Sequence, residues 1–371
     1  MNEALRRARL SGPLWTASLV ADRALRLNVL GRWPERRVPY ETLERQTVAI
    51  LEAWDVAEPR TVARHLLYAD LHGIVSHGVA MFRHYAEAPF ALAAAPEVVR
   101  DDGATALVDG GGGLGHLPAD RAMRLAIEKA REHGVGAVAV RNSGHFGAAG
   151  TYAALARDAG LIGIAMTNTR EPAVVPTHGA EPRLGTNAIA FAARELMLDM
   201  ATSTVSLGRA VARWRAGRRI PEGWAIDARG RAVRSGRVAG EQRRLTPLGS
   251  RPETSSHKGY GLAAMVETLC GVMTGGGVGH FLLALDPERF AGGAGGASGP
   301  GAGGDFAEAM DAFTASLRAT PRLDPNRAVL VPGDPERSAA QDRSARGIRL
   351  SRSVIEDLRL VAAGARVPFS L

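Results

Sequence analysis

The sequence predicts an α/β or α+β protein, and three observations favour that class. The chain has 371 residues, which is enough for about two domains at roughly 150 residues each. The segment before Pro89 shows helical periodicity. From Thr105 onward, short apolar runs alternate with longer helical segments, which is typical of helices packed on a sheet.

Three helices are expected first. Residues 41–56 have an amphipathic pattern, and Pro59 fits the first turn of a second helix that Gly73 closes. Ser76 is suited to cap a third helix, which Pro89 limits.

The alternating part then follows in order. Strands are expected at 105–109, 135–140, 161–168, 187–193, 196–201, 280–286 and 328–333. Helices are expected at 118–133, 148–159, 203–215, 258–273, 306–318 and 351–363. Residues 291–304 are glycine-rich and read as a flexible loop.

Composition limits the function classes. No apolar run reaches about 18 residues, so we expect no membrane span. The single cysteine, Cys270, cannot form an internal disulfide, which indicates a reducing compartment such as the cytoplasm; it lies in an apolar helical run and reads as a core residue. The net charge of +8 alone suggests a nucleic-acid binder, but the arginines are scattered and aromatics make up 5%. We therefore expect neither a nucleic-acid partner nor a metal.

The first 40 residues carry eight arginines against three acidic residues. This pattern suits a transit peptide, and it equally suits a poorly ordered extension or a start codon placed too far upstream. We favour the extension.

A glycine motif follows the expected strand 105–109. Gly110, Gly112 and Gly115 spell GxGxxG before a helix, as in a Rossmann loop. Such a loop also needs an acid at the end of the next strand, where Arg141 stands instead. Arg141 could face a 2′-phosphate, but four consecutive glycines match this motif easily, so a flexible turn is favoured.

Polar residues in five segments carry the candidate chemistry. On one helix, His77, His84 and Tyr85 would share a stripe with Met81, unless the two histidines simply lie at the surface. His145 sits in a glycine-flanked strand-to-helix turn, where backbone amides are free to meet an anion.

Two further segments place charged groups at expected element ends, and the fifth is the turn 332–334. Asp199 follows an apolar run and is either a buried carboxylate that needs a partner or a helix cap. Lys258 opens an apolar helix. Only Lys258 and Lys129 are lysines among 46 basic residues, which favours a contact at Lys258 that arginine cannot make.

These segments together resemble the malate/L-lactate dehydrogenase family of the non-Rossmann type, which includes ureidoglycolate, sulfolactate and diketogulonate dehydrogenases and piperideine-2-carboxylate reductases. The resemblance runs from about residue 41 to 350 and is carried by "ADLHGIVSHGV", "NSGHFGAAGTYA", "VVPTHGAEPRLGTNAIAFA", "LDMATS", "IPEGWAIDARG", "HKGYGLAAMVETLCGV", "GHFLLALDP" and "VPGDPE". In that family the "VDGGGGLGH" segment is a turn and not a Rossmann fingerprint.

The resemblance implies a fold, a cofactor and an assembly. It implies an N-terminal lobe over 41–115, an NAD(P)-binding domain over 116–288 with a mixed, largely antiparallel sheet, a loop over 289–305, and a segment over 306–371 that returns to the first lobe, after the extension 1–40. It also implies a homodimer that transfers a hydride between NAD or NADP and a 2-hydroxy or 2-oxo acid. A cyclic-imine acid reductase and a cofactor-binding member without turnover remain open.

The resemblance also implies roles for residues. Ser76, His77 and Asp199 match a proton relay, and His145 matches a histidine assigned as the base in ureidoglycolate dehydrogenases, so both histidines are kept. Nucleotide contacts are implied for Thr169, Asp199, Met200, Ala201, Lys258, Pro332, Gly333 and Asp334, and substrate contacts for His84, Tyr85, Thr186 and Asn187.

The chain departs from the family pattern at the expected substrate clamp. Met81 and His84 stand where the family usually has arginines, and Met81 cannot bind an anion. Either another element holds the substrate carboxylate with help from protonated His84, or the substrate is less anionic, or catalysis is impaired. The loop before Gly279 also looks shorter than usual.

Overall fold

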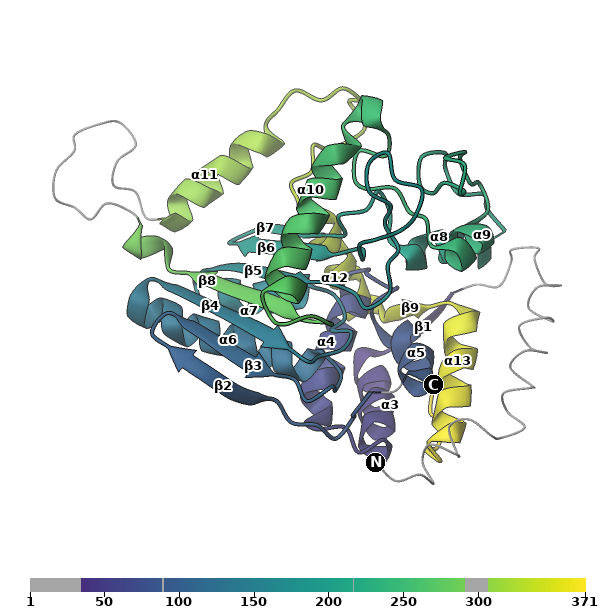
Figure 1. The fold of residues 1–371 in the computed structure, drawn as a ribbon. Coiled ribbons are helices and arrows are strands. Elements are labelled where there is room, and N and C mark those ends of the chain that lie inside the picture. The colour runs from purple at the N-terminus through teal and green to yellow at the C-terminus, as the bar shows by residue number, and fades with distance from the viewer. Residues whose placement is uncertain (1–34, 89, 216, 291–305) are drawn as a thin grey trace.

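The computed structural model describes residues 35–88, 90–215, 217–290 and 306–371 (Figure 1). Most of the expected extension, the glycine-rich loop and Pro89 lie outside these ranges. Within them, no helix combines the length and apolar character needed to cross a bilayer.

One seven-stranded sheet organises the molecule, in the order β2-β3-β4-β8-β5-β6-β7. Its strands are β2 (Glu97–Asp102), β3 (Thr105–Asp109), β4 (Val135–Arg141), β5 (Ile162–Thr167), β6 (Ala188–Ala193), β7 (Leu196–Met200) and β8 (His280–Leu285). β3 and β4 pair in parallel, and every other neighbouring pair is antiparallel. The expected α/β class with a mixed, largely antiparallel sheet is confirmed.

The strand register brings several element ends to one edge of the sheet. Thr167 lies opposite His280 and Ala188, and His280 lies opposite Val140. Ile189 lies opposite Met200 in the last pair. The last residues of β3, β4, β5 and β7 and the first residues of β6 and β8 therefore share this edge, which we call the site edge.

Helices cover both faces of the sheet. On one face, α6 (His116–His133) and α7 (Gly150–Asp158) bury a core of small residues that includes Ala126, Ala153 and Ala165. On the other face, α10 (Ser256–Glu267) continues as a π-helical turn, Thr268–Val272, and packs Cys270 against Met166. Because Ala165 and Met166 are consecutive strand residues, they point to opposite faces.

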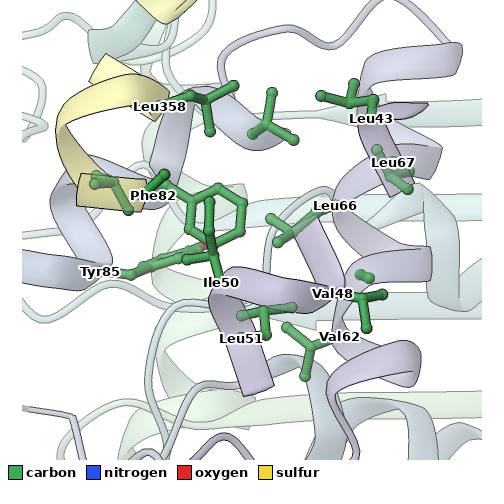
Figure 2. Close-up of a cluster of buried hydrophobic side chains, with 14 of the residues drawn as sticks. Leu43, Val48, Ile50, Leu51, Val62, Leu66, Leu67, Phe82, Tyr85 and Leu358 are labelled. Atoms are coloured by element: carbon green, nitrogen blue, oxygen red, sulfur yellow. The ribbon is translucent and has the colours of Figure 1, made fainter. Parts of the chain in front are cut away.

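Chain segments from both ends build the N-terminal lobe. α3 (Tyr40–Ala53), α4 (Pro59–Leu71) and α5 (Phe82–Glu87) share one hydrophobic core with α13 (Arg352–Gly364). Figure 2 shows Tyr85 and Phe82 of α5 beside Ile50, with Leu358 of α13 in the same cluster. β1 (Arg36–Val38) pairs with β9 (Ile348–Leu350), so ordered structure already begins within the segment expected to be an extension.

The remaining helices lie outside the sheet core. α8 (Leu207–Arg215) and α9 (Gly236–Gln242) contribute to a third cluster of buried residues with Val174 and Leu245. α11 (Phe306–Arg318) leads toward α12 (Asp334–Arg346), and Figure 1 shows α8 and α9 to the right of α10.

The structure corrects two predicted elements. Residues 328–333 form no strand: Leu330 is 61% exposed, and the Pro332 carbonyl instead accepts a hydrogen bond from the Met197 amide. The third helix does not begin at Ser76. A short 3-10 turn, Val79–Met81, precedes α5, and Ser76 bonds to the neighbouring imidazole instead of capping. His77 therefore does not share a helical stripe with His84.

The glycine motif is not a phosphate loop. β3, α6 and β4 form a parallel strand-helix-strand unit, as a Rossmann loop requires. However, the Gly110, Gly112 and Gly115 amides donate to the carbonyls of Arg141, Asn142 and His145, so they are unavailable to a ligand. The turn that was favoured over the Rossmann loop is what the structure contains.

Candidate active site

The turn that carries His77 is held from behind by a buried carboxylate. Asp70 of α4 accepts a hydrogen bond from the Val79 amide at 2.8 Å. A Cβ at position 78 would lie 2.2 Å from the Asp70 carboxyl carbon, so only glycine fits there. Burial raises the pKa of Asp70 to about 7. In front of this turn, the Ser76 hydroxyl and His77 Nδ1 lie 2.8 Å apart.

His145 follows β4 at the site edge, and its hydrogen bonds define its tautomer. Nδ1 lies 2.8 Å from the Tyr85 hydroxyl and accepts the Gly147 amide at 3.2 Å. Burial raises the pKa of Tyr85 well above its usual value, so the phenol stays neutral and donates to this nitrogen. Since Nδ1 accepts, the hydrogen-bond network assigns the proton of neutral His145 to Nε2.

The histidine rings gather where the N-terminal lobe meets the site edge. The ring centroids of His77 and His145 are 5.6 Å apart and stacked, and His84 meets His145 edge-on at 6.4 Å. Burial lowers the pKa of His77 and, with the nearby imidazoles, lowers the pKa of His145 further. Both rings are thus neutral at neutral pH without a ligand.

His116, at the first turn of α6, is a further member of this cluster. Its ring lies 5.7 Å from that of Tyr85 and is fully buried. Neither ring nitrogen has a hydrogen-bond partner among the described residues. An unpaired buried polar group costs about 1–3 kcal/mol, so this ring is suited to bind a water molecule or a ligand atom. Sequence reasoning missed it, although "GLGH" at a helix start was a usable signal.

Asp199 lies at the end of β7 and is engaged elsewhere. Its carboxylate accepts the Gly150 amide at 2.8 Å at the start of α7. Burial, opposed by this bond, raises the pKa of Asp199 to about 6. In the described part of the chain, it makes no hydrogen bond or ion pair with Ser76 or His77. The structure therefore brings together His77, His145, His84 and Tyr85, and it leaves Asp199 at the end of β7, bonded to the start of α7.

The expected nucleotide residues follow the other half of the site edge. The Thr202 amide, next to Ala201, donates to the Thr186 carbonyl at 2.9 Å, and the Leu248 amide donates to the Thr202 carbonyl at 2.8 Å. A Cβ at Gly259 would lie 2.3 Å from the Leu248 nitrogen. This series of contacts places the start of α10, and with it Lys258, beside the end of β7.

The two lysines differ sharply. Lys129 is 7% exposed, forms an ion pair with Asp101 and donates to the Gly103 carbonyl at 2.6 Å. Lys258 is exposed, and its ammonium has no ion pair within the described ranges. Lys258 is therefore available to a ligand, whereas Lys129 has a structural role.

Other expected contacts are partly occupied by the protein itself. The Asn187 side-chain amide donates to the Ala263 carbonyl and to Glu267, while its oxygen is buried without a partner among the described residues. Thr169 Oγ1 would lie 2.1 Å from a Cβ at Gly185. In the turn 332–334, Asp334 is paired with Arg318 and Arg337, which hold its pKa far below the usual range.

A cavity of about 560 Å³ lies apart from the histidine cluster, between the segments 175–179, 222–232 and 246–256. It reaches the start of α10 at Ser256 but includes none of the clustered histidines. Across the described ranges, no group of three or more histidine, cysteine, aspartate or glutamate residues is arranged to hold a metal ion.

Comparison with known proteins identifies the family. Residues 38–359 match the model of the malate/L-lactate dehydrogenase family. The chain belongs to this family. It is a dehydrogenase of the malate/L-lactate dehydrogenase type, as the sequence motifs indicated.

Members of the malate/L-lactate dehydrogenase family resemble the chain over most of its length. A malate dehydrogenase of Pyrococcus horikoshii is 35% identical over 88% of this chain and 94% of its own. A malate dehydrogenase structure from Entamoeba histolytica has a TM-score of 0.84 at 29% identity, covering 91% of this chain and all of its own. A δ1-piperideine-2-carboxylate reductase structure from Pseudomonas syringae has a TM-score of 0.75 at 26% identity, covering 88% and 100% of the two chains.

Proposed function

We propose that this protein transfers a hydride between NAD(P) and C2 of a 2-hydroxy or 2-oxo acid, such as malate, lactate, sulfolactate or ureidoglycolate. The observation that carries the proposal is the pair of imidazoles 5.6 Å apart at the site edge, one of which has a fixed tautomer. A carbonyl reduction needs one group to hold the oxygen and one to supply its proton.

The site edge fits a nicotinamide dinucleotide. Lys258 offers a free cation for a phosphate, and the unpartnered oxygen of buried Asn187 offers an acceptor for an amide. We assign the dinucleotide to Lys258, Thr169, the end of β7 at 199–201 and the turn 332–334. The bound nicotinamide supplies or receives the hydride, so the protein must supply orientation and a proton.

His145 is suited to hold the substrate oxygen. Its Nδ1 is occupied by Tyr85 and Gly147, so the neutral ring can present only an Nε2–H donor. A donor with a fixed direction polarises a carbonyl without moving a proton. Tyr85 thus acts through His145, because the phenol is fully buried.

His77 is better suited to exchange the proton. Its Nδ1 faces the Ser76 hydroxyl, which can either donate or accept, so neither tautomer is fixed. During reduction, Nε2 of protonated His77 gives its proton to the carbonyl oxygen while C2 gains the hydride, and the product is the 2-hydroxy acid. A bound carboxylate raises the pKa of this imidazole and favours the protonated form. Asp199 supports the relay only if it leaves Gly150 when ligands bind.

The nearest alternative is reduction of a cyclic imine acid. The structural likeness to the piperideine-2-carboxylate reductase favours this substrate class. In that reaction the imine nitrogen takes the proton, and the same two histidines would orient and protonate it. A member that binds the cofactor without turnover is a further alternative, motivated by Met81 in place of an expected arginine.

Fluorescence of NADH and NADPH on mixing with the protein tests the cofactor, and it also decides which one is preferred. A panel of 2-oxo acids and cyclic imine acids then tests the substrate. We expect binding of at least one cofactor and oxidation of it by a 2-oxo acid. Lack of binding to either cofactor would refute the proposal, and binding without turnover of any 2-oxo acid would favour one of the two alternatives.

We also propose that the protein is a homodimer in the cytoplasm. Val272 and Met273, after α10, are 69% and 53% exposed and give an apolar surface suited to a second copy. Size-exclusion chromatography with light scattering tests the dimer.

A further inference from the structure

The histidine cluster has no cation from its own helix. Arg83 of α5 turns away from the site: its guanidinium lies 3.1 Å from Asp357 and 3.3 Å from Glu87. Met81 is uncharged, and both histidine rings that flank the reacting oxygen are neutral without a ligand. A 2-oxo acid is an anion at neutral pH, so its carboxylate needs a positive group from another element.

α9 carries Arg243 at its C-terminal end and is connected to the His77 turn through α8. A Cβ at Gly208 would lie 3.1 Å from the Ser76 Cβ, so the start of α8 is packed against the His77 turn. α9 packs on α8 in turn: a Cβ at Gly236 would lie 2.1 Å from the Ala210 carbonyl oxygen. Arg243 is the residue that ends α9, and its carboxylate partner is Glu171, two residues after Thr169.

The charge of Arg243 affects one member of the histidine cluster, His84. Burial lowers the pKa of His84 most, the charge of Glu87 opposes this shift, and the Arg243 guanidinium adds to it. The His84 ring lies beside that of His145. The Arg243 side chain is 36% exposed, so the cation is partly desolvated. A guanidinium has five N–H donors, and a single carboxylate such as Glu171 leaves donors for a second one.

Arg243 also occupies a backbone position that suits glycine better. Its φ is +51°, in the left-handed region. A residue with a side chain held there costs of order 1–3 kcal/mol, so the backbone gives no reason for an arginine.

We propose that Arg243 binds the carboxylate of the substrate and sets the preference for 2-oxo acids over uncharged carbonyl compounds. This inference rests on the proposed function and adds to it the residue that recognises the acid. Arg243 is a binding residue supplied by α9, in place of the cation that α5 does not offer.

The test is Arg243→Gly, with Arg244→Gly as the matched control. Glycine suits the positive φ, so the first variant should unfold at the same or a higher temperature than the wild type. We expect KM for the preferred 2-oxo acid to rise about 10–100-fold, the scale of a lost charged hydrogen bond. The dissociation constant of the cofactor should stay unchanged. Arg244 donates to the Ala180 carbonyl at 3.2 Å, and its loss should leave KM unchanged.

Two further measurements separate recognition from structure. The methyl ester of the same acid should show equal KM values in wild type and Arg243→Gly, and Arg243→Lys should recover part of the affinity for the acid. The inference would be overturned by an unchanged KM for the acid in Arg243→Gly, or by an equal rise in KM for acid and ester. Turnover of the acid by the wild type would still support the proposed function in either case. If the wild type reduces no 2-oxo acid, both fail together.

Discussion

His65 and the histidine cluster of the candidate site are built differently. His65 of α4 is 1% exposed, with Nε2 2.9 Å from Asp120 and Nδ1 2.9 Å from Thr151. It joins α4 to α6 and α7, and both nitrogens are used. In the candidate site, His77 contacts one hydroxyl, His145 keeps a free Nε2, and His116 has no partner in the described part of the chain. Satisfied rings stabilise the fold, whereas unsatisfied rings are available for chemistry.

His65 and the cluster also differ in charge. Asp120, beside His65, also accepts hydrogen bonds from Arg64 and Arg124. Burial alone would raise the pKa of Asp120, but these hydrogen bonds and charges hold it far below the usual range. No carboxylate contacts the His77 ring among the described residues, so burial lowers its pKa unopposed. In the proposed mechanism a bound anion is therefore what charges this imidazole, and protonation is coupled to substrate binding.

Removing the His77 imidazole should have the largest effect, and that effect should be on turnover. His77→Ala should lower kcat by about 100- to 10,000-fold, the usual contribution of a general acid. Cofactor fluorescence should be unchanged, because the role proposed for this ring is toward the substrate and not the cofactor. If His77→Ala keeps normal turnover and His145→Ala loses it, the roles assigned to these two rings are reversed.

Weakening the hydrogen bond of the structural histidine, His65, should affect stability instead of turnover. Asp120→Asn leaves His65 with a weaker partner, and we expect a loss of about 1–3 kcal/mol in the free energy of unfolding. Urea denaturation at pH 7 measures it, and kcat at 25 °C should stay within twofold. A large drop in kcat without loss of stability would erase the distinction between His65 and the cluster.

Asp70 tests whether the carboxylate behind the His77 turn carries charge. Its pKa of about 7 exceeds that of an ordinary aspartate, so between about pH 4 and pH 7 the folded protein binds this proton more tightly than the unfolded chain. Stability should therefore fall as pH rises through that window. Asp70→Asn should reduce this fall by on the order of 4 kcal/mol, at about 1.4 kcal/mol per pKa unit. Parallel stability profiles for variant and wild type would contradict the raised pKa.

Substituting the two lysines should give the smallest change in the measured properties. Lys258→Arg should raise the cofactor dissociation constant by roughly 3–10-fold, because a guanidinium does not fit a close ammonium contact. Lys129→Arg is the matched control, since that lysine is buried against Asp101. It should lower the melting temperature and leave cofactor affinity unchanged, and the reverse pattern would exchange the two roles.

Strands with an apolar signal were predictable. β3 spans the same residues that the sequence predicts, and β4 extends the prediction by one residue. β2 was missed because all six of its residues are exposed, so no apolar alternation marks it. Residues 328–333 have the apolar run but no partner strand, which a local pattern cannot reveal.

The site was predictable only where chemistry clusters along the chain. His145 stands out in a glycine-flanked turn and His77 as one of two histidines on an expected helix, and the structure brings the two rings together. His65 and Asp120 are 55 positions apart, and their contact arises only in the fold. Arg243 has no local signal, because many arginines in this chain look the same in sequence.

The pairing of β1 with β9 has a consequence for biosynthesis. The hydrophobic core of the N-terminal lobe contains Val38 and Leu43, made early, together with Ile348 and Leu358, made late. On the ribosome, α3 and α4 must wait for almost the whole chain before their partners emerge. During that delay their apolar faces are open to chaperones, so the yield of folded protein should depend on the last helix to be translated.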